Sequence, residues 1–234
     1  MTAQDHTQEA IRRTVVVIPA YNEHAVIREV VTEVAALGCE VCVVDDGSRD
    51  GTAAALEHAP CVLIRHAINR GQGAALQTGL TYAIRHGADF VVTFDGDGQH
   101  DPADIAAMLG PIASGTADVI FGSRFLGSAT GISWARRLVL RIGVIGTRVL
   151  TGLLVTDTHN GLRALTRAAA QAITLRGDGM AHASEFYDQV ARADLRFAEV
   201  PVSVRYTEYS RAKGQTTLNV FRVAGQYLLL RLFR

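Results

Sequence analysis

Residues 89–100 read DFVVTFDGDGQH, a short apolar run followed at once by carboxylates, glycines and an amide. The first six residues predict a strand that is buried on both faces, because apolar and β-branched side chains follow one another without alternation. The last six predict a tight loop at the carboxyl end of this strand, since Asp and Gly favour turns. A sheet with such loops presents polar side chains at one edge.

The first half of the chain repeats this succession of apolar strand, polar loop and helix. Alternation at this spacing predicts an α/β fold with an open, mainly parallel sheet and helices on both faces. Ligands bind beyond the carboxyl ends of the strands in such sheets, so we expect one site along that edge. Strands are expected at residues 14–19, 40–44, 61–65, 89–94 and 118–122, and helices at 23–37, 71–86 and from Asp101 onward.

The second half has a different pattern. Residues 132–155 have the spacing of a basic helix, and residues 197–206 alternate as a strand does. No linker or repeat separates the halves, so we expect one domain over residues 14–215. Residues 1–13 are expected to be an N-terminal tail, and residues 216–234 a C-terminal amphipathic helix.

The composition favours a globular protein. The 234 residues, 48% of them hydrophobic, suffice for one sizeable core and exclude a disordered chain. The longest stretch without a charged residue is 71–84, which is shorter than the roughly 18 residues that a membrane-spanning helix needs. Residues 1–13 are too polar for a secretory signal. We therefore expect a cytoplasmic protein without a membrane span.

The formal net charge of zero conceals an uneven distribution. Residues 1–118 hold 16 acidic residues and 7 arginines, whereas residues 119–234 hold 7 acidic and 16 basic residues. An acidic half can hold a metal ion, and a basic half can receive phosphates or an anionic surface. Nucleic acid is disfavoured as a partner, because the few aromatic residues are not interleaved with the arginines.

The loop after residue 94 is the sharpest functional signal. Asp95 and Asp97 stand one glycine apart directly after a strand, so both carboxylates can reach one hard cation, and Gln99 can add an oxygen. We expect Mg²⁺ or Mn²⁺ there, bridging to the oxygens of a bound diphosphate. The alternative is a solvated turn, since Asp and Gly are common in turns.

Two further loops have side chains suited to a nucleotide. Asp45 and Asp46 can accept hydrogen bonds from a base or a ribose, unless their loop only caps the next helix. Arg70 lies in a Gly-rich turn before a helix, which can hold a phosphate. A dinucleotide-binding fingerprint would follow the first strand, where residues 19–23 read PAYNE instead. A nicotinamide-dependent dehydrogenase is therefore disfavoured.

Residues 136–150 form a basic amphipathic pattern. In a helical projection Arg137, Arg141 and Arg148 fall within about 40° of one another, and apolar side chains take the other side. Such a helix can lie on an anionic membrane surface or bind a lipid-borne phosphate. The alternative is an ordinary surface helix with its apolar face on the core.

Together these motifs resemble family 2 glycosyltransferases, which have the nucleotide-sugar-binding fold called GT-A. The resemblance covers about residues 14–215. GSR at 122–124 and DTHNG at 157–161 make the chain similar to the dolichyl- and polyprenyl-phosphate mannose synthase branch in particular. The motifs shared with the wider family are IPAYNE at 18–23, VVDDGSRDGT at 43–52, NRGQGA at 69–74 and FDGDGQH at 94–100.

The resemblance implies roles for individual residues. Arg124 and Arg137 would face the sugar diphosphate or the acceptor phosphate and act in catalysis with Asp97, and Arg141 would add charge beside them. The expected metal ligands are Asp95, Asp97 and Gln99. The expected nucleotide-binding residues are Pro19, Tyr21, Glu23, Asp45, Asp46, Arg70 and Asp95.

One signature of the branch differs in this sequence. The branch commonly ends its catalytic domain with Arg-x-x-Gly-x-Ser-Lys, whereas residues 209–216 read YSRAKGQT. The charge that covers the diphosphate is therefore expected from Arg211 or Lys213. Some relatives continue into membrane helices. Here we expect peripheral attachment at the cytoplasmic face, through the amphipathic segments or a separate small membrane-embedded partner. A homo-oligomer is an open alternative.

The resemblance implies an inverting transfer of one sugar from GDP-mannose or a UDP-hexose to a polyprenyl phosphate. An acceptor phosphate is already an anion and needs little help from a base. A transferase of the same fold that acts on a sugar hydroxyl is the alternative, and Glu185 or Asp157 would then be its base. A non-catalytic subunit that binds nucleotide sugars is the third hypothesis, which the intact pair Asp95 and Asp97 disfavours.

Overall fold

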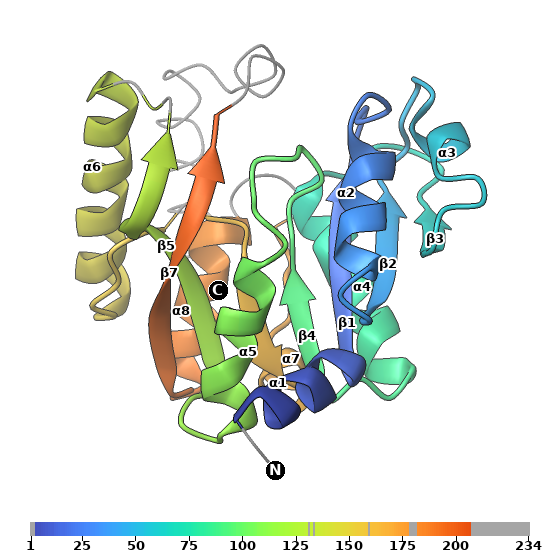
Figure 1. Ribbon diagram of the computed structural model, residues 1–234. Coiled ribbons are helices and arrows are strands. Elements are labelled where there is room, and N and C mark those ends of the chain that lie inside the picture. Colours follow the sequence, from blue (N-terminus) through green and yellow to red (C-terminus); the bar gives the residue numbers. More distant parts are fainter. Residues whose placement is uncertain (1–2, 131, 133, 159, 178–181, 207–234) are drawn as a thin grey trace.

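The computed structural model describes residues 3–130, 132, 134–158, 160–177 and 182–206. Its strands form one seven-stranded sheet in the order β3-β2-β1-β4-β6-β5-β7 (Figure 1). β6 runs antiparallel to both of its neighbours, and the other pairs are parallel. The prediction of an open, mainly parallel α/β sheet is confirmed. The strands are β1 Thr14–Ala20, β2 Glu40–Asp45, β3 Val62–Arg65, β4 Phe90–Thr93, β5 Val119–Thr130, β6 Arg163–Thr166 and β7 Phe197–Arg205.

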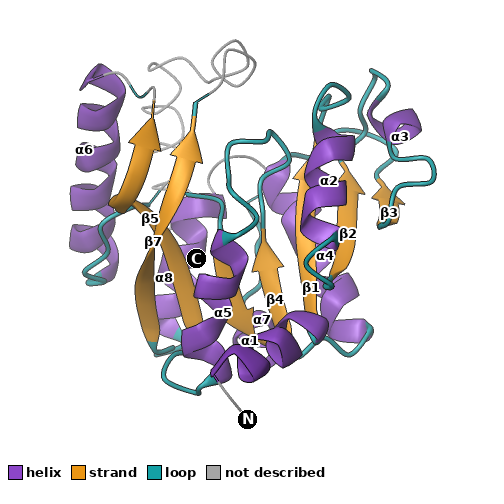
Figure 2. Ribbon diagram, in the orientation of Figure 1, coloured by secondary structure: helices purple, strands orange, loops and turns teal. Residues whose placement is uncertain are grey.

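Helices cover both faces of the sheet (Figure 2). One core joins α1, α2 and α5 to the sheet, and a second core joins α4, α7 and α8 to the opposite face. In β1 the side chains of Val16 and Ile18 enter the first core, and those of Val15 and Val17 enter the second. This explains why the strand is apolar without alternation. The helices are α1 Ala3–Arg12, α2 Ile27–Ala35, α3 Thr52–Ala55, α4 Gln72–Arg85, α5 Asp104–Ala113, α6 Trp134–Thr151, α7 Arg167–Ala172 and α8 His182–Arg192.

The expected N-terminal tail is largely a helix. Residues 3–12 form α1, and Ala10 and Ile11 are buried in the core that α5 also enters. The prediction of a tail over residues 1–13 is wrong for this part. Two apolar residues among many polar ones give too weak a pattern for a sequence-based prediction, and only the packing against α5 reveals the helix. The predicted helix at 216–234 lies outside the described residues.

α6 lies at the far edge of the sheet, beside β5 (Figure 1). It has 18 residues, among them Arg137, Arg141 and Arg148. Within the described part of the chain, no helix combines the length and the apolar character needed to cross a membrane.

Candidate active site

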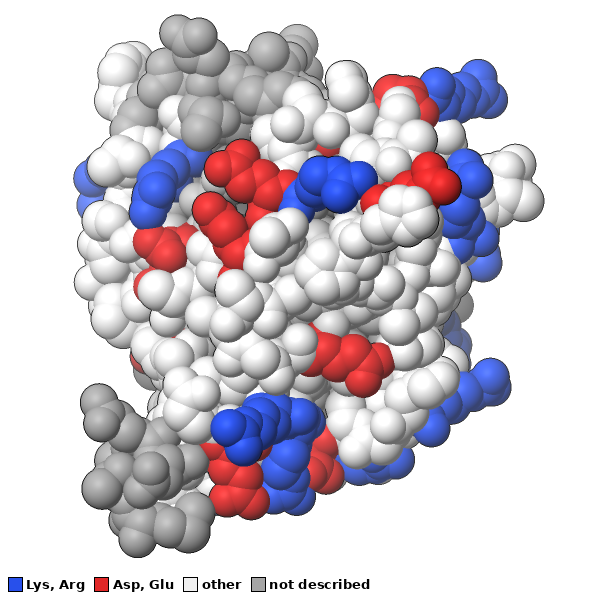
Figure 3. Space-filling model, turned by 45° about the vertical axis from the view of Figure 1, so that its right-hand side comes forward, with Lys and Arg blue, Asp and Glu red and all other residues white. Residues whose placement is uncertain are grey.

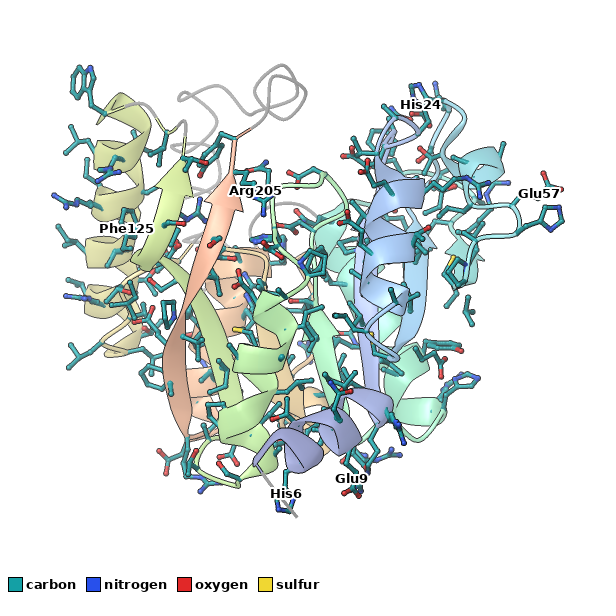
Figure 4. The ribbon with its side chains drawn as sticks, in the orientation of Figure 1. His6, Glu9, His24, Glu57, Phe125 and Arg205 are labelled. Atoms are coloured by element: carbon teal, nitrogen blue, oxygen red, sulfur yellow. The ribbon has the colours of Figure 1, made fainter. Side chains whose placement is uncertain are left out.

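Loops that follow β1 to β4 meet at one edge of the sheet, as the sequence predicts. Figure 4 marks this edge by His24, after β1, and by Arg205 at the end of β7. Residues that are far apart in the chain contact one another directly here. Hydrogen bonds join Asn22 N to Ser48 Oγ (2.9 Å), Arg70 N to Asp46 Oδ1 (3.0 Å) and Gln72 Nε2 to Asp95 Oδ1 (3.0 Å).

Asp45 and Asp46 hold these loops in place. Both side chains are buried. Asp46 accepts hydrogen bonds from the backbone N–H groups of Arg70 (3.0 Å) and Gly71 (2.6 Å), and its Oδ1 lies 2.7 Å from His66 Nδ1. Asp45 accepts from the backbone of Ser48 and from a neighbouring arginine on β3. The two carboxylates therefore brace the turn in which Arg70 lies.

The other predicted nucleotide ligands lie along the same edge. Pro19 pairs with Val44 across β1 and β2, and Tyr21 follows it with 42% of its surface exposed. Glu23 is half-buried, and its backbone N–H donates to Thr52 Oγ1 (2.8 Å). The edge thus combines an exposed aromatic ring with carboxylates and the braced turn in which Arg70 lies.

Asp95 is enclosed by residues from three other parts of the chain. Its Oδ1 accepts from Gln72, and its Oδ2 lies 3.3 Å from His100 Nε2. Gly161 abuts the carboxylate so closely that a Cβ there would come 2.1 Å from Oδ2. Burial opposes ionisation of Asp95, but the hydrogen bond and charge of His100, followed by the charge of Arg163, hold its pKa below the ordinary value.

Asp97 has the opposite electrostatic environment. Burial, and then the charge of Asp95, raise the pKa of Asp97 to about 6. The backbone N–H and the side-chain amide of Gln99 both donate to its carboxylate. A divalent cation would relieve the repulsion between the two carboxylates. Carboxylates, an amide oxygen and phosphate oxygens are the ligands that Mg²⁺ and Mn²⁺ prefer, so these residues fit such an ion.

The protein by itself supplies only part of a metal site. Among the described residues, no three His, Cys, Asp or Glu side chains surround a common metal position. Water and the oxygens of a bound diphosphate would have to complete the coordination, as is usual for Mg²⁺ at phosphate sites.

A buried arginine lies beneath the acidic loop. Arg163 of β6 is 2% exposed, and its guanidinium carbon lies 4.6 Å from the centre of the Phe186 ring. β6 pairs Arg163 with Thr93 of β4, the strand that leads into the loop. The sequence analysis assigned no role to Arg163, nor to Gln72 and Gly161, which it quotes only as parts of family motifs. A charged residue within an apolar strand is the signal that could have revealed it.

Arg124 is buried in the middle of β5. Its Nε donates to Asp157 Oδ2 (2.6 Å), its backbone N–H donates to the same oxygen (3.1 Å), and its Nη1 donates to Tyr206 Oη. Burial by itself would lower the pKa of the guanidinium, but the charge of Asp157 and the interactions with Tyr206 together outweigh it, and the net shift is upward. Asp157 therefore fixes the orientation of Arg124.

A cavity of about 470 Å³ lies between β5 and α6. Its lining includes several arginines and no acidic residue, so its surface attracts anions. Arg148 is oriented by donating from Nε to Val155 O (2.7 Å). The lining brings together Arg124 of β5 with three arginines of α6, Arg137, Arg141 and Arg148.

The apolar stripe of α6 faces outward. Leu140 and Val144 face the rest of the protein and are buried, whereas the residues of the stripe are between 51% and 79% exposed. At about 100° per residue, the stripe spans an arc of about 80° that adjoins the row of arginines. The hypothesis of an ordinary helix with its whole apolar face on the core is therefore wrong (Figure 4). The stripe consists of Trp134, Leu138, Ile142, Ile145 and Val149.

Glu185 lies in the first turn of α8 and is 3% exposed. Its Oε2 accepts from the backbone N–H groups of Arg176 (3.0 Å) and Gly177 (2.7 Å). These bonds give it a loop-holding role, and a role as a base stays a prediction. The predicted charges at Arg211 and Lys213 lie outside the described residues.

A sequence model of the family described as glycosyl transferase family 2 matches residues 15–174. The chain belongs to glycosyl transferase family 2. The matched span begins in β1 and ends after α7, so it contains every loop of the acidic edge and the whole of α6. The expectation that this protein is a glycosyltransferase is confirmed.

Similar proteins align over most of this family 2 glycosyltransferase. UDP-N-acetylglucosamine–dolichyl-phosphate N-acetylglucosaminyltransferase of Methanococcus voltae is 32% identical, and the alignment covers 92% of this chain and 95% of the relative. Polyprenol monophosphomannose synthase of Mycolicibacterium smegmatis is 34% identical, with 86% and 80% covered.

The crystal structure of Mycobacterium tuberculosis glucosyl-3-phosphoglycerate synthase superposes with a TM-score of 0.73. It is 22% identical in sequence, and the match covers 97% of this chain and 82% of that one. A complex of the same enzyme with Mn²⁺, UDP and glucosyl-3-phosphoglycerate has a TM-score of 0.71 at 21% identity, with 97% and 84% covered. The likeness shows the shared fold, which confirms the expected GT-A architecture.

Proposed function

We propose that this glycosyltransferase moves one sugar from a nucleotide diphosphate sugar, GDP-mannose or a UDP-hexose, to a polyprenyl phosphate with inversion. The observation that carries the proposal is the arginine-lined cavity beside the outward apolar stripe of α6. A polyprenyl phosphate has an anionic head, which matches the arginine-lined cavity, and a long apolar chain, which matches the apolar stripe. The relatives from M. voltae and M. smegmatis are named for transfer to dolichyl phosphate and for synthesis of a polyprenol monophosphate sugar, which supports this acceptor.

The donor would lie at the acidic edge. Tyr21 and Glu23 would contact the nucleotide, and Arg70, which lies in the turn braced by Asp46, would contact its phosphates. Mg²⁺ or Mn²⁺, held by Asp95, Asp97 and Gln99, would neutralise charge on the leaving diphosphate.

The acceptor would lie on the basic side. Arg124, held by Asp157, and Arg137 would fix the acceptor phosphate so that one of its oxygens faces the anomeric carbon. That oxygen forms the new bond as the bond from the anomeric carbon to the diphosphate breaks on the opposite face, which inverts the configuration. No proton needs to be removed, because the phosphate oxygen is already anionic.

The apolar stripe would place the enzyme on the membrane that holds its acceptor. Trp134 and its neighbours would enter the lipid interface, and the adjoining arginines would meet anionic headgroups. This makes the protein peripheral at the cytoplasmic face. A small membrane-embedded partner covering the stripe, or a second copy of the chain, is the competing occupant.

Transfer assays with labelled GDP-mannose and UDP-hexoses test the proposal, with polyprenyl phosphate in vesicles as acceptor. We expect the Arg137→Ala and Arg141→Ala variants to lose at least about tenfold in kcat/KM for the lipid. Arg85→Ala, at an exposed arginine at the end of α4, is the matched control and should leave turnover unchanged.

The Glu185→Gln variant distinguishes a lipid-phosphate acceptor from a sugar-hydroxyl acceptor. A sugar-hydroxyl enzyme that uses this base should lose about 10²-fold or more. Transfer to a sugar hydroxyl with none to the lipid phosphate would overturn the proposal.

A further inference from the structure

Glu199 of β7 is an acidic residue beside the arginine-lined cavity. Acidic side chains gather in the upper part of the face that Figure 3 shows, whereas no described acidic residue lines this cavity. Glu199 is half-buried, and its carboxylate contacts Thr156, which does line the cavity. The charge of a carboxylate this near an anion site opposes the binding of an anion. The position of Glu199 therefore needs an explanation other than its charge.

The carboxylate of Glu199 holds the segment that connects α6 to β6. The backbone N–H of Thr156 lies 2.8 Å from Oε1 and 2.9 Å from Oε2. The hydroxyl of Thr156 donates to Oε1 (3.0 Å), and the backbone N–H of Asp157 donates to the same oxygen (3.2 Å). These contacts are all with backbone or hydroxyl hydrogens rather than with a cation. Glu199 thus serves as a hydrogen-bond acceptor that fixes a turn of the backbone.

Two helices fix the same segment from other directions. Arg148 of α6 donates from Nε to the backbone carbonyl that precedes Thr156 (2.7 Å). The hydroxyl of Tyr187 of α8 donates to the backbone carbonyl of Asp157 (2.9 Å). Glu199 adds the hold from the sheet, on the N–H side of Asp157. The backbone of Asp157 is therefore held on both sides, which restricts where its carboxylate can lie.

Arg124 lies where β5 departs from regular pairing with β7. Residues 124–127 of β5 stand opposite Val202 of β7 alone, so the register shifts there. Irregularities of this kind re-aim the side chains of the strand. Asp157 supplies what the shifted strand lacks, because its Oδ2 accepts from both the backbone N–H and Nε of Arg124. The direction of this guanidinium therefore depends on the place of Asp157.

We propose that Glu199 is a positioning residue for the acceptor phosphate. It fixes the backbone of Asp157, Asp157 orients Arg124, and Arg124 contacts the phosphate in the cavity. The inference rests on the proposed function, because it takes the arginine-lined cavity as the site of the acceptor phosphate. A role through charge alone has the opposite consequence, since removal of the carboxylate would then strengthen the binding of an anion. The sign of the change in affinity distinguishes the two roles.

Calorimetric titration of the full chain with farnesyl phosphate, a short polyprenyl phosphate, tests the proposal. We expect Glu199→Ala to bind it at least about tenfold more weakly, because Arg124 loses its fixed orientation. Glu199→Gln should lose less, since its amide oxygen can replace Oε1, which accepts three of the four contacts.

Asp118→Asn is the matched control for these variants. Asp118 also holds β7 against β5, by accepting from the backbone N–H of Arg196 (2.9 Å) and from its guanidinium. These contacts lie at the opposite end of the two strands, just before Val119 and Phe197. The control should bind farnesyl phosphate as the unaltered protein does. Thermal unfolding of each variant verifies that it folds.

The double variant R124K/E199A tests whether Glu199 acts through Arg124. Arg124→Lys keeps the positive charge but loses the contact of Nε with Asp157. In this background Glu199→Ala should weaken binding by less than about threefold, because the group that Glu199 helps to orient is already absent. A loss as large as in the unaltered background would overturn the proposed route. In transfer assays with Glu199→Ala, the KM for farnesyl phosphate should rise while the KM for the nucleotide sugar changes by less than about twofold.

Failure of this inference differs from failure of the proposed function. If Arg137→Ala binds farnesyl phosphate as tightly as the unaltered protein, the cavity is not the acceptor site and both are overturned. If Arg137→Ala binds it weakly while Glu199→Ala binds it as tightly as the unaltered protein or more tightly, only the positioning role is overturned. Should Glu199→Ala not fold, Glu199→Asp replaces it, because the shorter side chain keeps the charge but withdraws the oxygens from Thr156. Weaker binding then supports the positioning role, and unchanged or tighter binding overturns it.

Discussion

The acidic edge and the basic side of this glycosyltransferase are built in opposite ways. At the acidic edge the carboxylates already have protein partners, since Asp46 accepts two backbone hydrogen bonds and Asp95 is enclosed by three other residues. On the basic side, Arg137 and Arg141 are exposed around a cavity, and the apolar stripe beside them faces outward. One side is organised before a ligand arrives. The basic side has exposed arginines and an exposed apolar surface that the other described residues do not cover.

The Asp97→Ala variant tests whether the acidic edge depends on a cation, and we expect the largest effect there. Metal-dependent binding of UDP or GDP should disappear, and turnover should fall by on the order of 10³-fold, because the charge on the leaving diphosphate loses its compensation. Calorimetric titration with Mn²⁺ and then with EDTA measures this. Asp89→Ala, which changes a carboxylate just before β4, at its opposite end, is the control. Nucleotide binding that EDTA leaves unchanged would contradict the assignment.

The buried pair of Arg124 and Asp157 is a part of the basic side that, like the acidic edge, already has protein partners. Asp157→Asn would remove the carboxylate charge with which the buried guanidinium of Arg124 pairs, and we expect a loss of about 3 kcal/mol in the free energy of unfolding. Asp188→Asn breaks a pair whose arginine, Arg192, is half exposed, and should lose less than about 1 kcal/mol. Urea unfolding of both variants measures the two losses in the free energy of unfolding. Equal losses would mean that burial of Arg124 makes no energetic difference.

Replacing three residues of the apolar stripe tests the basic side. The variant L138S/I142S/I145S should bind anionic vesicles at least about tenfold more weakly, because each side chain contributes apolar area to the interface. Its free energy of unfolding should change by less than about 0.5 kcal/mol per residue, since the side chains are exposed. Sedimentation with vesicles measures the first effect. V62S/I68S, on exposed apolar residues elsewhere, is the control, and an equal loss in it would contradict membrane contact through α6.

The smallest expected effect is the dependence of metal affinity and stability on pH, which should arise at the acidic edge. The pKa of Asp97, about 6, lies above the ordinary 3.8, so Mn²⁺ affinity should fall by up to about tenfold per pH unit below 6 as a proton competes for the carboxylate. Without metal, the folded protein binds this proton more tightly than the unfolded chain. Its contribution to stability is therefore present at low pH and lost as pH rises through about 6. Titrations at several pH values measure both, and a flat profile would contradict the assignment.

Much of the fold follows from short-range pattern. The expected strands at 14–19 and 40–44 are found as β1 and β2, because a strand covered on both faces is apolar throughout. β6 was not predicted. It has only four residues, includes Arg163, and runs antiparallel between two parallel strands, so its place depends on partners far away in the chain.

The candidate site, like the fold, was predicted from the sequence only in part. The loop with Asp95 and Asp97 was predicted, since carboxylates and glycines directly after a buried strand are a local signal. The residues that enclose Asp95 were not, because Gln72 and Gly161 come from distant parts of the chain. The loop-bracing contacts of Glu185 likewise have no local signature.

The sequence by itself determined the class of sheet, the edge at which the polar loops gather, and the presence of a basic amphipathic helix. These are properties of residues within one turn or one strand of each other. Only the tertiary structure decided that Asp46 braces a loop, that Arg124 is buried against Asp157, and that the apolar stripe of α6 faces away from the core. A periodic pattern defines which residues share a face. Which face is buried depends on what the rest of the chain packs against it.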